Sequence, residues 1–281
     1  MVATARAFAR RELGPKQELR FLEKIRLANG TFKTTAFGRL DDLNQMVSTC
    51  WKQLGASPRA ILDVAVSSGI TSKEWIDQLL GEGFDVHLTA TDLTLSAHLV
   101  GLGPGLEVLL DGSGNVLQYS LLGLALPERR RWFEYLSGAG IVKRIADQLI
   151  RAKGRKTLIE SSLEEVMLVN AGALNHPRIT FVEDDIFAKS APDSVAGRFD
   201  ALRAANILNF VYFGRDEIIR AISNLRQRLS GPGAFLIVVR TQADGTNHGS
   251  MFRLNADKKF EVVLRIGNGS EIEELVLSGT A

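Results

Sequence analysis

The chain has 281 residues, of which 45% are hydrophobic and 23% charged, so it can bury a sizeable core. Its 34 Lys and Arg residues against 32 Asp and Glu give a formal net charge of +2, without the positive excess typical of nucleic-acid-binding proteins. The single cysteine, Cys50, excludes an internal disulfide, and four scattered histidines with no C-x-x-C pattern argue against a metal site.

Two amphipathic helices are predicted near the start of the chain, at residues 16–29 and 41–54, because apolar side chains recur there at helical spacing. A glycine follows each of them as a stop signal. The residues before them are rich in Ala and Arg, but they lack the apolar core of a signal peptide. Residues 1–58 are therefore predicted to form an N-terminal helical cap.

From residue 60 onward, short apolar runs alternate with helical segments, which is typical of a parallel sheet built from βαβ units. This pattern predicts an α/β fold, a doubly wound sheet whose ligand site lies at the carboxyl ends of the strands. The strands are expected at 60–66, 84–91, 179–182, 199–205 and 234–240, and the helices between them at 71–80, 162–174 and 215–229.

Two segments interrupt the alternation. An insertion at about 101–157 contains a predicted hairpin, with EVLLD and VLQYS around the turn DGSGN, and a helical stretch at 128–153. The tail, 251–278, is predicted to form strands, with a Gly-Asn-Gly turn between FEVVLRI and SEIEELVL.

The first predicted strand ends in a run of small residues, Asp63-Val64-Ala65-Val66-Ser67-Ser68-Gly69, and passes directly into a helix. Small side chains let backbone N–H groups approach a ligand, and a helix N-terminus favours negative charge. An ordinary tight turn between a strand and a helix would show the same pattern.

Acidic residues follow the next two strands. Asp92 ends the second, where a carboxylate can accept hydrogen bonds from both ribose hydroxyls of an adenosine ligand, and Leu93 comes directly after it. Asp184 and Asp185 follow the third strand, where a carboxylate can read an adenine amino group while Ile186 packs on the ring. Because each acid comes just past a strand, the three positions together favour a nucleoside site.

These segments resemble class I S-adenosylmethionine-dependent methyltransferases. Residues 63–69 match the glycine-rich first motif of that family, although Ala65 and Ser67 stand where glycines are usual, and residues 199–210 match its fourth motif. The stretch around Asn206, with Tyr212 and Phe213, is also similar to chemotaxis-receptor glutamate methyltransferases.

The resemblance implies a Rossmann-like seven-stranded sheet in residues 59–281, with the insertion at about 101–157, and S-adenosyl-L-methionine as cofactor. It covers about 60–100 and 160–240. The residues that it implies for cofactor binding are Asp63, Ala65, Val66, Ser67, Gly69, Asp92, Leu93, Asp185, Ile186 and Asn206.

A histidine after the fifth strand is the candidate catalytic residue. His248 lies in a predicted loop that can cross the mouth of the site, where a general base would take the proton from a hydroxyl acceptor. An exposed loop histidine is the alternative interpretation. Arg129 to Trp132, a basic and aromatic flank, is interpreted as a solvated helix start, with an anionic surface or acidic substrate as the alternative.

We therefore expect a methyltransferase that acts on a small-molecule acceptor, at oxygen or nitrogen. A protein carboxylate acceptor and a catalytically idle binding protein of the same fold are the alternatives. No uncharged apolar run reaches the roughly 18 residues of a membrane span, so we expect no stable membrane insertion. The single cysteine favours a reducing, cytoplasmic setting, and the near-neutral net charge gives no reason to expect a nucleic-acid partner. The N-terminal cap and the insertion are expected to form a lid over the site.

Overall fold

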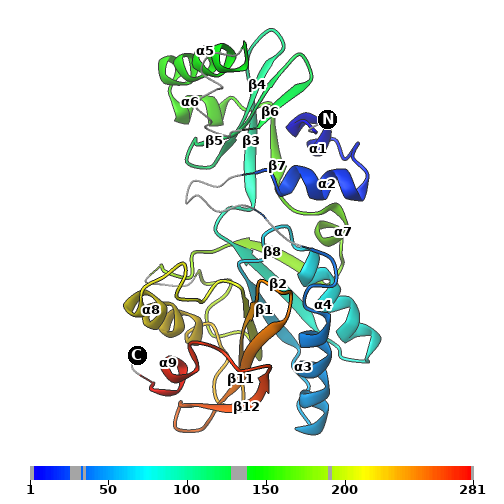
Figure 1. Ribbon diagram of the computed structural model, residues 1–281, viewed down its shortest axis with the longest axis vertical. Coiled ribbons are helices and arrows are strands. Elements are labelled where there is room, and N and C mark those ends of the chain that lie inside the picture. Colours follow the sequence, from blue (N-terminus) through cyan, green and yellow to red (C-terminus); the bar gives the residue numbers. More distant parts are fainter. Residues whose placement is uncertain (1–2, 26–32, 34–35, 128–137, 189–191, 280–281) are drawn as a thin grey trace. The chain divides into compact units, whose positions relative to one another are not determined.

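The computed structural model describes residues 3–25, 33, 36–127, 138–188 and 192–279 (Figure 1). It divides into two compact units: unit 1 contains residues 1–35 and 94–171, and unit 2 contains residues 36–93 and 172–281. The parts of the predicted helices at 26–29 and 128–137, and the segment from Arg129 to Trp132, lie outside the described residues.

Unit 2 is built on a seven-stranded sheet in the order β12-β11-β10-β9-β1-β2-β8. The five strands from β8 to β10 run parallel, and β11 and β12 extend the sheet in antiparallel fashion. The strands are β1 (Ala60–Val64), β2 (His87–Asp92), β8 (Ile179–Glu183), β9 (Ala201–Ala205), β10 (Phe235–Thr241), β11 (Asn247–Leu254) and β12 (Phe260–Ile266). The described helices of this part are α3 (Asp41–Gln53), α4 (Ile70–Gly81), α7 (Ala171–Leu174), α8 (Arg215–Arg226) and α9 (Glu273–Leu277).

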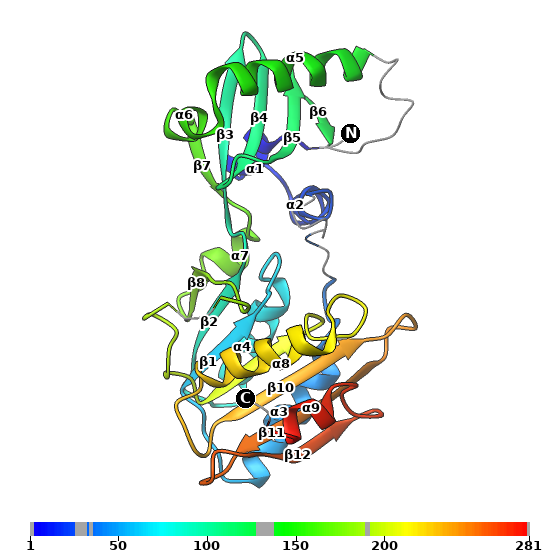
Figure 2. The same ribbon diagram turned by 90° about the vertical axis from the view of Figure 1, so that its left-hand side faces the viewer.

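Helices cover both faces of this sheet (Figure 2). Side chains alternate between the two faces of a strand, and on β10 Leu236 and Val238 share one hydrophobic cluster with α8 and α9. Phe235 points to the other face, where its ring lies 6.0 Å from the ring of Trp51 in α3. Trp51 lies 6.2 Å from Trp75 of α4. The predicted α/β class is confirmed, and the sheet is doubly wound.

The strand order reverses between β1 and β9, which are neighbours in the sheet. From β1 the chain passes through α4 to β2, and from β9 it passes through α8 to β10, on the opposite face. Such a reversal opens a crevice at the carboxyl ends of the two strands, the usual place for a ligand in sheets of this kind.

Two predicted elements are wrong. The segment predicted as a helix at 162–174 forms β7 (Glu164–Met167) and the short α7, because it pairs with β3 as an edge strand. In the tail, β12 is as predicted, but the last predicted strand forms the helix α9. Ile272, Leu275 and Val276 recur at helical spacing and pack in the cluster beneath α8, which stabilises the helix.

Unit 1 is a five-stranded antiparallel sheet in the order β6-β5-β4-β3-β7, also with helices on both faces. Ala97 and Leu99 of β3 pack in a cluster with α1 and α2, and Val100 and Leu102 pack in a second cluster with α5 and α6. The predicted hairpin is confirmed as β4 and β5. The elements are α1 (Ala5–Ala9), α2 (Pro15–Leu22), β3 (Ser96–Gly103), β4 (Leu106–Asp111), β5 (Val116–Leu121), β6 (Leu124–Pro127), α5 (Gly138–Lys153) and α6 (Arg155–Glu160).

The division of the chain differs from the one predicted. Helices α1 and α2 belong to unit 1, because Phe8 and Phe21 pack on its sheet. Helix α3, which was predicted to be part of the same cap, belongs to unit 2, where Trp51 packs against Trp75. The insertion is also longer than 101–157: it runs from residue 94 to residue 171 and carries the strands of unit 1.

Candidate functional site

The turn after β1 has a strained backbone. Ala65, Ser67 and Gly69 have φ values of +56°, +58° and +77°, a region that residues other than glycine rarely adopt. Left-handed geometry thus recurs at every second residue, at the positions where the sequence resemblance has glycines. A side chain at Gly69 would also meet a neighbour, because its Cβ would lie 3.0 Å from Cζ of Phe181. Strain of this kind persists where the surroundings enforce it, which is common at ligand sites.

Hydrogen bonds inside the protein hold this turn. The N–H of Ser67 donates to Oδ2 of Asp92 at 2.6 Å, the N–H of Val66 to the carbonyl of Thr91, and the N–H of Gly69 to the carbonyl of Val66. Asp92 is buried at the end of β2, whereas the next side chain, Leu93, is 51% exposed. The structure therefore brings Asp92 against the first turn, across the carboxyl ends of two neighbouring strands.

Asp63 lies beneath the turn in a buried ion pair. Its carboxylate accepts hydrogen bonds from Nε and Nη2 of Arg203 at 2.9 and 2.6 Å and from the hydroxyl of Ser72 at 2.6 Å. The side chains of Arg203 and Asp63 are only 1% and 3% exposed. Arg203 stacks over the ring of Trp75 at 4.1 Å and donates to the carbonyl of Thr71. Asp63 thus joins β1, β9 and the start of α4 and supports the turn from below.

The acids after β8 have two different environments. Asp184 is buried and accepts two hydrogen bonds from Arg228, at 2.9 and 2.8 Å. Asp185 is exposed, and its Oδ1 accepts the N–H of Phe187. Ile186 is buried in the cluster against α8. Asp185 is therefore open to a ligand, whereas the side chain of Ile186 is committed to the core.

Asn206 follows β9 with a left-handed backbone, at φ +62°. Its Oδ1 accepts the N–H of Thr241 at 2.7 Å, and its Nδ2 donates to the Thr241 hydroxyl at 3.2 Å. That hydroxyl donates to Asn247, whose Nδ2 donates to the carbonyl of Arg39 and to Asp42. A series of hydrogen bonds thus joins the ends of β9 and β10 to the segment before α3. The sequence pattern gave no sign that Thr241, Asn247 or Arg39 takes part in this hydrogen-bond network.

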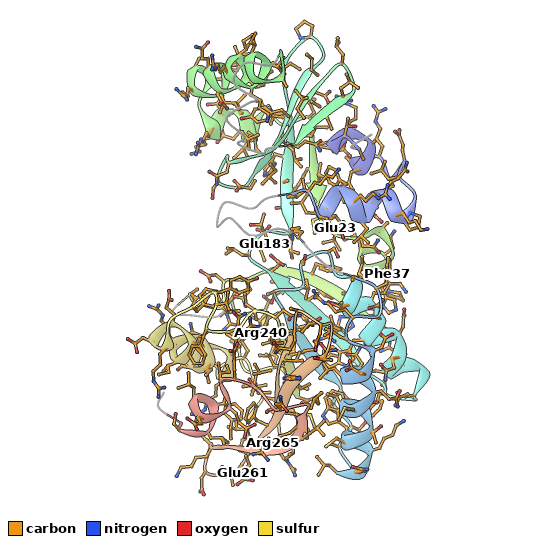
Figure 3. All side chains as sticks on the ribbon, viewed as in Figure 1. Glu23, Phe37, Glu183, Arg240, Glu261 and Arg265 are labelled. Carbon is orange, nitrogen blue, oxygen red and sulfur yellow. The ribbon has the colours of Figure 1, made fainter. Side chains whose placement is uncertain are left out.

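Two ionisable side chains lie where the segment before α3 meets α4: Arg39 in that segment and Glu74 in α4. The N–H of Gly38 donates to Oε1 of Glu74 at 2.9 Å. Burial raises the pKa of the Glu74 carboxyl, and burial together with the nearby Arg203 charge lowers the pKa of the Arg39 guanidinium. Phe37, labelled in Figure 3, directly precedes Gly38 in the chain and is 58% exposed.

The loop after β9 exposes a run of apolar side chains. Phe210, Val211 and Tyr212 are 46%, 69% and 61% exposed. Phe213 anchors the loop, because its ring lies 4.7 Å from that of Phe187. The carboxyl edge of the sheet therefore carries exposed apolar surface next to the reversal point.

His248 does not lie in a loop. It is the second residue of β11, paired with Arg240 of β10, and its ring lies against Gly267, where a Cβ would come within 2.5 Å of its Cδ2. Four strand spacings, about 19 Å, separate β11 from β2. The structure thus brings Ala65 to Gly69 and Asp92 together, but it does not bring His248 next to them.

Within the described ranges, no group of three or more His, Cys, Asp and Glu side chains is arranged to hold a metal ion. In the same part of the chain, no helix has both the length and the apolar character that a membrane crossing requires.

Comparison with known proteins gives only distant structural likeness. No protein-family model and no curated protein matches the sequence. The N-methyltransferase NodS from Bradyrhizobium japonicum WM9, in complex with S-adenosyl-L-homocysteine, aligns over 81% of this chain and 74% of its own, with 11% identity and a TM-score of 0.36. The PH0226 protein from Pyrococcus horikoshii OT3 aligns over 86% and 82%, with 11% identity and a TM-score of 0.35.

The citrinin polyketide synthase CMeT domain aligns over 71% of this chain at 14% identity and a TM-score of 0.35, and the match spans 34% of that structure's own length. These scores are too low to assign a family. The strand order of unit 2 therefore defines its fold class. The likeness to chemotaxis-receptor glutamate methyltransferases gains no support from these matches.

Proposed function

We propose that unit 2 binds S-adenosyl-L-methionine at the carboxyl ends of β1 and β2 and transfers its methyl group to an acceptor. The observation that carries the proposal is the turn after β1, with alternating left-handed residues and with the Asp92 carboxylate bonded to the N–H of Ser67. This arrangement sets the carboxylate of Asp92 beside a turn whose small side chains let a ligand approach the backbone, near the reversal point of the sheet. A carboxylate in this position can accept hydrogen bonds from the ribose of a nucleoside ligand.

The same contacts argue against a dinucleotide. A diphosphate needs backbone N–H groups that are open at the first turn. Here three N–H groups of the turn, those of Val66, Ser67 and Gly69, already donate to protein acceptors, which leaves fewer donors for a diphosphate, and the Asp92 carboxylate would repel a phosphate. A nucleoside with a positively charged sulfonium and no diphosphate fits this turn better.

The proposed roles follow from exposure and contacts. Asp92 accepts the ribose hydroxyls, the backbone from Ala65 to Gly69 lies along the ligand, and Leu93 packs beside it. Asp185 is available to the adenine amino group. Asp63 and Asn206 are positioning residues, because their side chains are engaged by Arg203 and Thr241, and the side chains of Val66 and Ile186 lie in the core.

When bound, the cofactor supplies an electrophilic methyl group, and the protein's main task is to align an acceptor with it. We propose a small-molecule acceptor with an apolar body, because Phe210, Val211 and Tyr212 are exposed at the end of β9. His248 can act as the general base only for an acceptor that extends two strand spacings, about 10 Å, from β9 to β11.

Isothermal titration with S-adenosylhomocysteine tests the cofactor. Asp92→Asn keeps an oxygen for the N–H of Ser67 but removes the charge, so we expect affinity to fall about tenfold or more. Asp257→Asn, an exposed acid between β11 and β12, is the matched control and should bind as the wild type does. Equal binding by Asp92→Asn and the wild type would refute the role of Asp92, and tighter binding of NADH would refute the cofactor.

Transfer of a labelled methyl group into a lysate tests the acceptor. Label in the small-molecule fraction supports the proposal, and label only in protein favours a protein carboxylate acceptor. Failure to bind either adenosyl ligand, together with a stable complex with another protein, would favour a catalytically idle binding protein.

A further inference from the structure

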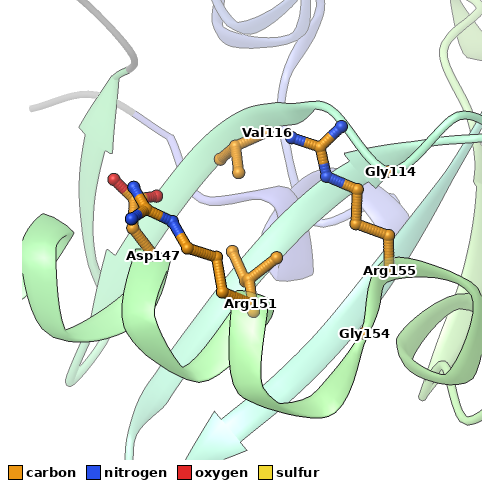
Figure 4. Close-up of a pocket in the computed structure, with 7 residues that line it drawn as sticks. Gly114, Val116, Asp147, Arg151, Gly154 and Arg155 are labelled. Carbon is orange, nitrogen blue, oxygen red and sulfur yellow. The ribbon is translucent and has the colours of Figure 1, made fainter.

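Unit 1 contains a cavity of about 250 Å³ that the proposed function does not use (Figure 4). It lies between α5, the start of α6 and the hairpin that joins β4 to β5. Arg151 of α5 and Arg155 of α6 both line it, and Asp147 lines it one turn before Arg151. Gly154, with φ +80°, separates the two helices, so the arginines reach the cavity from different directions.

The hairpin turn is shaped to receive Arg155. Gly114 has φ +77°, and a Cβ there would lie 2.6 Å from Cβ of Arg155, so a larger residue would displace the arginine stem. The side chain of Asp111 orders this turn by accepting the N–H groups of Ser113 and Asn115. A fixed turn therefore supports one of the two guanidinium groups.

The cavity lining combines apolar and charged side chains. Val116 and Ile150 contribute apolar surface, and Ile150 is 4% exposed within the cluster under α5. Asp147 is held in place, because its Oδ1 accepts the hydroxyl of Tyr119 at 2.6 Å. Among the described residues, no carboxylate forms an ion pair with Arg151 or Arg155, and the only hydrogen bond of the Arg155 guanidinium is a long one of 3.5 Å to Asn115.

The surrounding helices add positive charge. Residues 138–160 contain six basic and two acidic side chains: Lys143, Arg144, Arg151, Lys153, Arg155 and Lys156 against Asp147 and Glu160. Positive potential around a recess attracts an anion, and the planar guanidinium fork matches the oxygens of a carboxylate or a phosphate.

We propose that this cavity binds a small organic anion, a carboxylate or a phosphate monoester. Its oxygens would accept hydrogen bonds from Arg151 and Arg155, and its compact apolar body would lie on Val116 and Ile150. A hydroxyl or amino group of the ligand would donate to Asp147. The site lies within unit 1 and does not rest on the methyltransferase proposal.

The test follows the methyl NMR signals of Val116 and Ile150 in the full chain during titration. The probes are phenyl phosphate and benzoate, with phenol as the neutral analogue of the same body. We expect saturable shifts of these methyl signals with one or both anions and no saturation with phenol. Absence of saturation with both anions, or equal binding of phenol, would overturn the proposal.

Three variants separate the cavity from the general charge of the helices. Arg151→Gln and Arg155→Gln should each weaken anion binding about tenfold or more, because each removes charged hydrogen-bond donors. Lys153→Gln removes the same charge from α5 outside the cavity lining and should change affinity less than twofold. Equal weakening by Lys153→Gln would show diffuse attraction and overturn the site. Unchanged far-UV circular dichroism in all three variants shows that the chain still folds, independently of the methyltransferase proposal.

Discussion

Replacing Asp63 with asparagine tests the support of the first turn. The substitution keeps the size of the side chain but leaves the guanidinium of Arg203, whose side chain is 1% exposed, without its countercharge. Removing one partner of a buried ion pair costs about 3–5 kcal/mol. Arg203 keeps its hydrogen bonds to Asn44 and Thr71, and the amide oxygen of the new side chain remains as one acceptor. We therefore expect a loss of about 3 kcal/mol, the lower end of that range, in the unfolding free energy of unit 2.

Urea unfolding followed by tryptophan fluorescence measures this loss. Trp51 and Trp75 both belong to unit 2, and Trp75 stacks on Arg203. The third tryptophan, Trp132, falls in the range of unit 1, so all variants are made in a Trp132→Phe background and the emission then reports on unit 2. The double variant Asp63→Asn with Arg203→Met removes both charges and should recover part of the loss, since the uncompensated charge is then gone. A loss below about 1 kcal/mol in Asp63→Asn, or no recovery in the double variant, would refute the assigned support.

Three further predictions concern the same unit. Ala65→Gly and Ser67→Gly should each raise the unfolding free energy by about 0.5 kcal/mol in urea, because glycine relieves the left-handed strain at some entropic cost. Gly69→Ala should lower the unfolding free energy, because alanine is strained at this positive φ and its Cβ would press against the ring of Phe181. A loss of stability in Ala65→Gly or Ser67→Gly would contradict the assigned strain. Glu74→Gln should stabilise the protein at neutral pH, because burial raises the pKa of the folded-state carboxyl and its ionisation therefore opposes folding. The advantage should vanish below the unfolded-state pKa of about 4.5, and an advantage that persists at low pH would exclude charge as its cause. For an acceptor that extends from β9 to β11, His248→Asn should leave S-adenosylhomocysteine binding unchanged and slow methyl transfer about 100-fold. A rate within about twofold of the wild type would exclude His248 as the general base.

The sequence by itself determined the parallel strands and the order of the site elements along the chain. Strands β1, β2, β8, β9 and β10 lie within a few residues of their predicted ranges, because buried parallel strands are continuous apolar runs that need no partner to be seen. It also placed the small residues before α4 and the acid at Asp92, since both depend on local spacing after a strand.

Only the tertiary structure decided which residues meet. Arg203 was part of a strand in the sequence pattern, and pairing of β1 with β9 is what brings it to Asp63, 140 residues away. Glu164–Met167 forms a strand because it pairs with the edge of β3. The tail ends in a helix because the apolar side chains of α9 pack against α8. His248 was predicted to lie in a loop, and only the strand order shows that four strand spacings separate it from Asp92. Local propensity specifies elements, whereas long-range pairing and burial, which the sequence does not display, specify their partners.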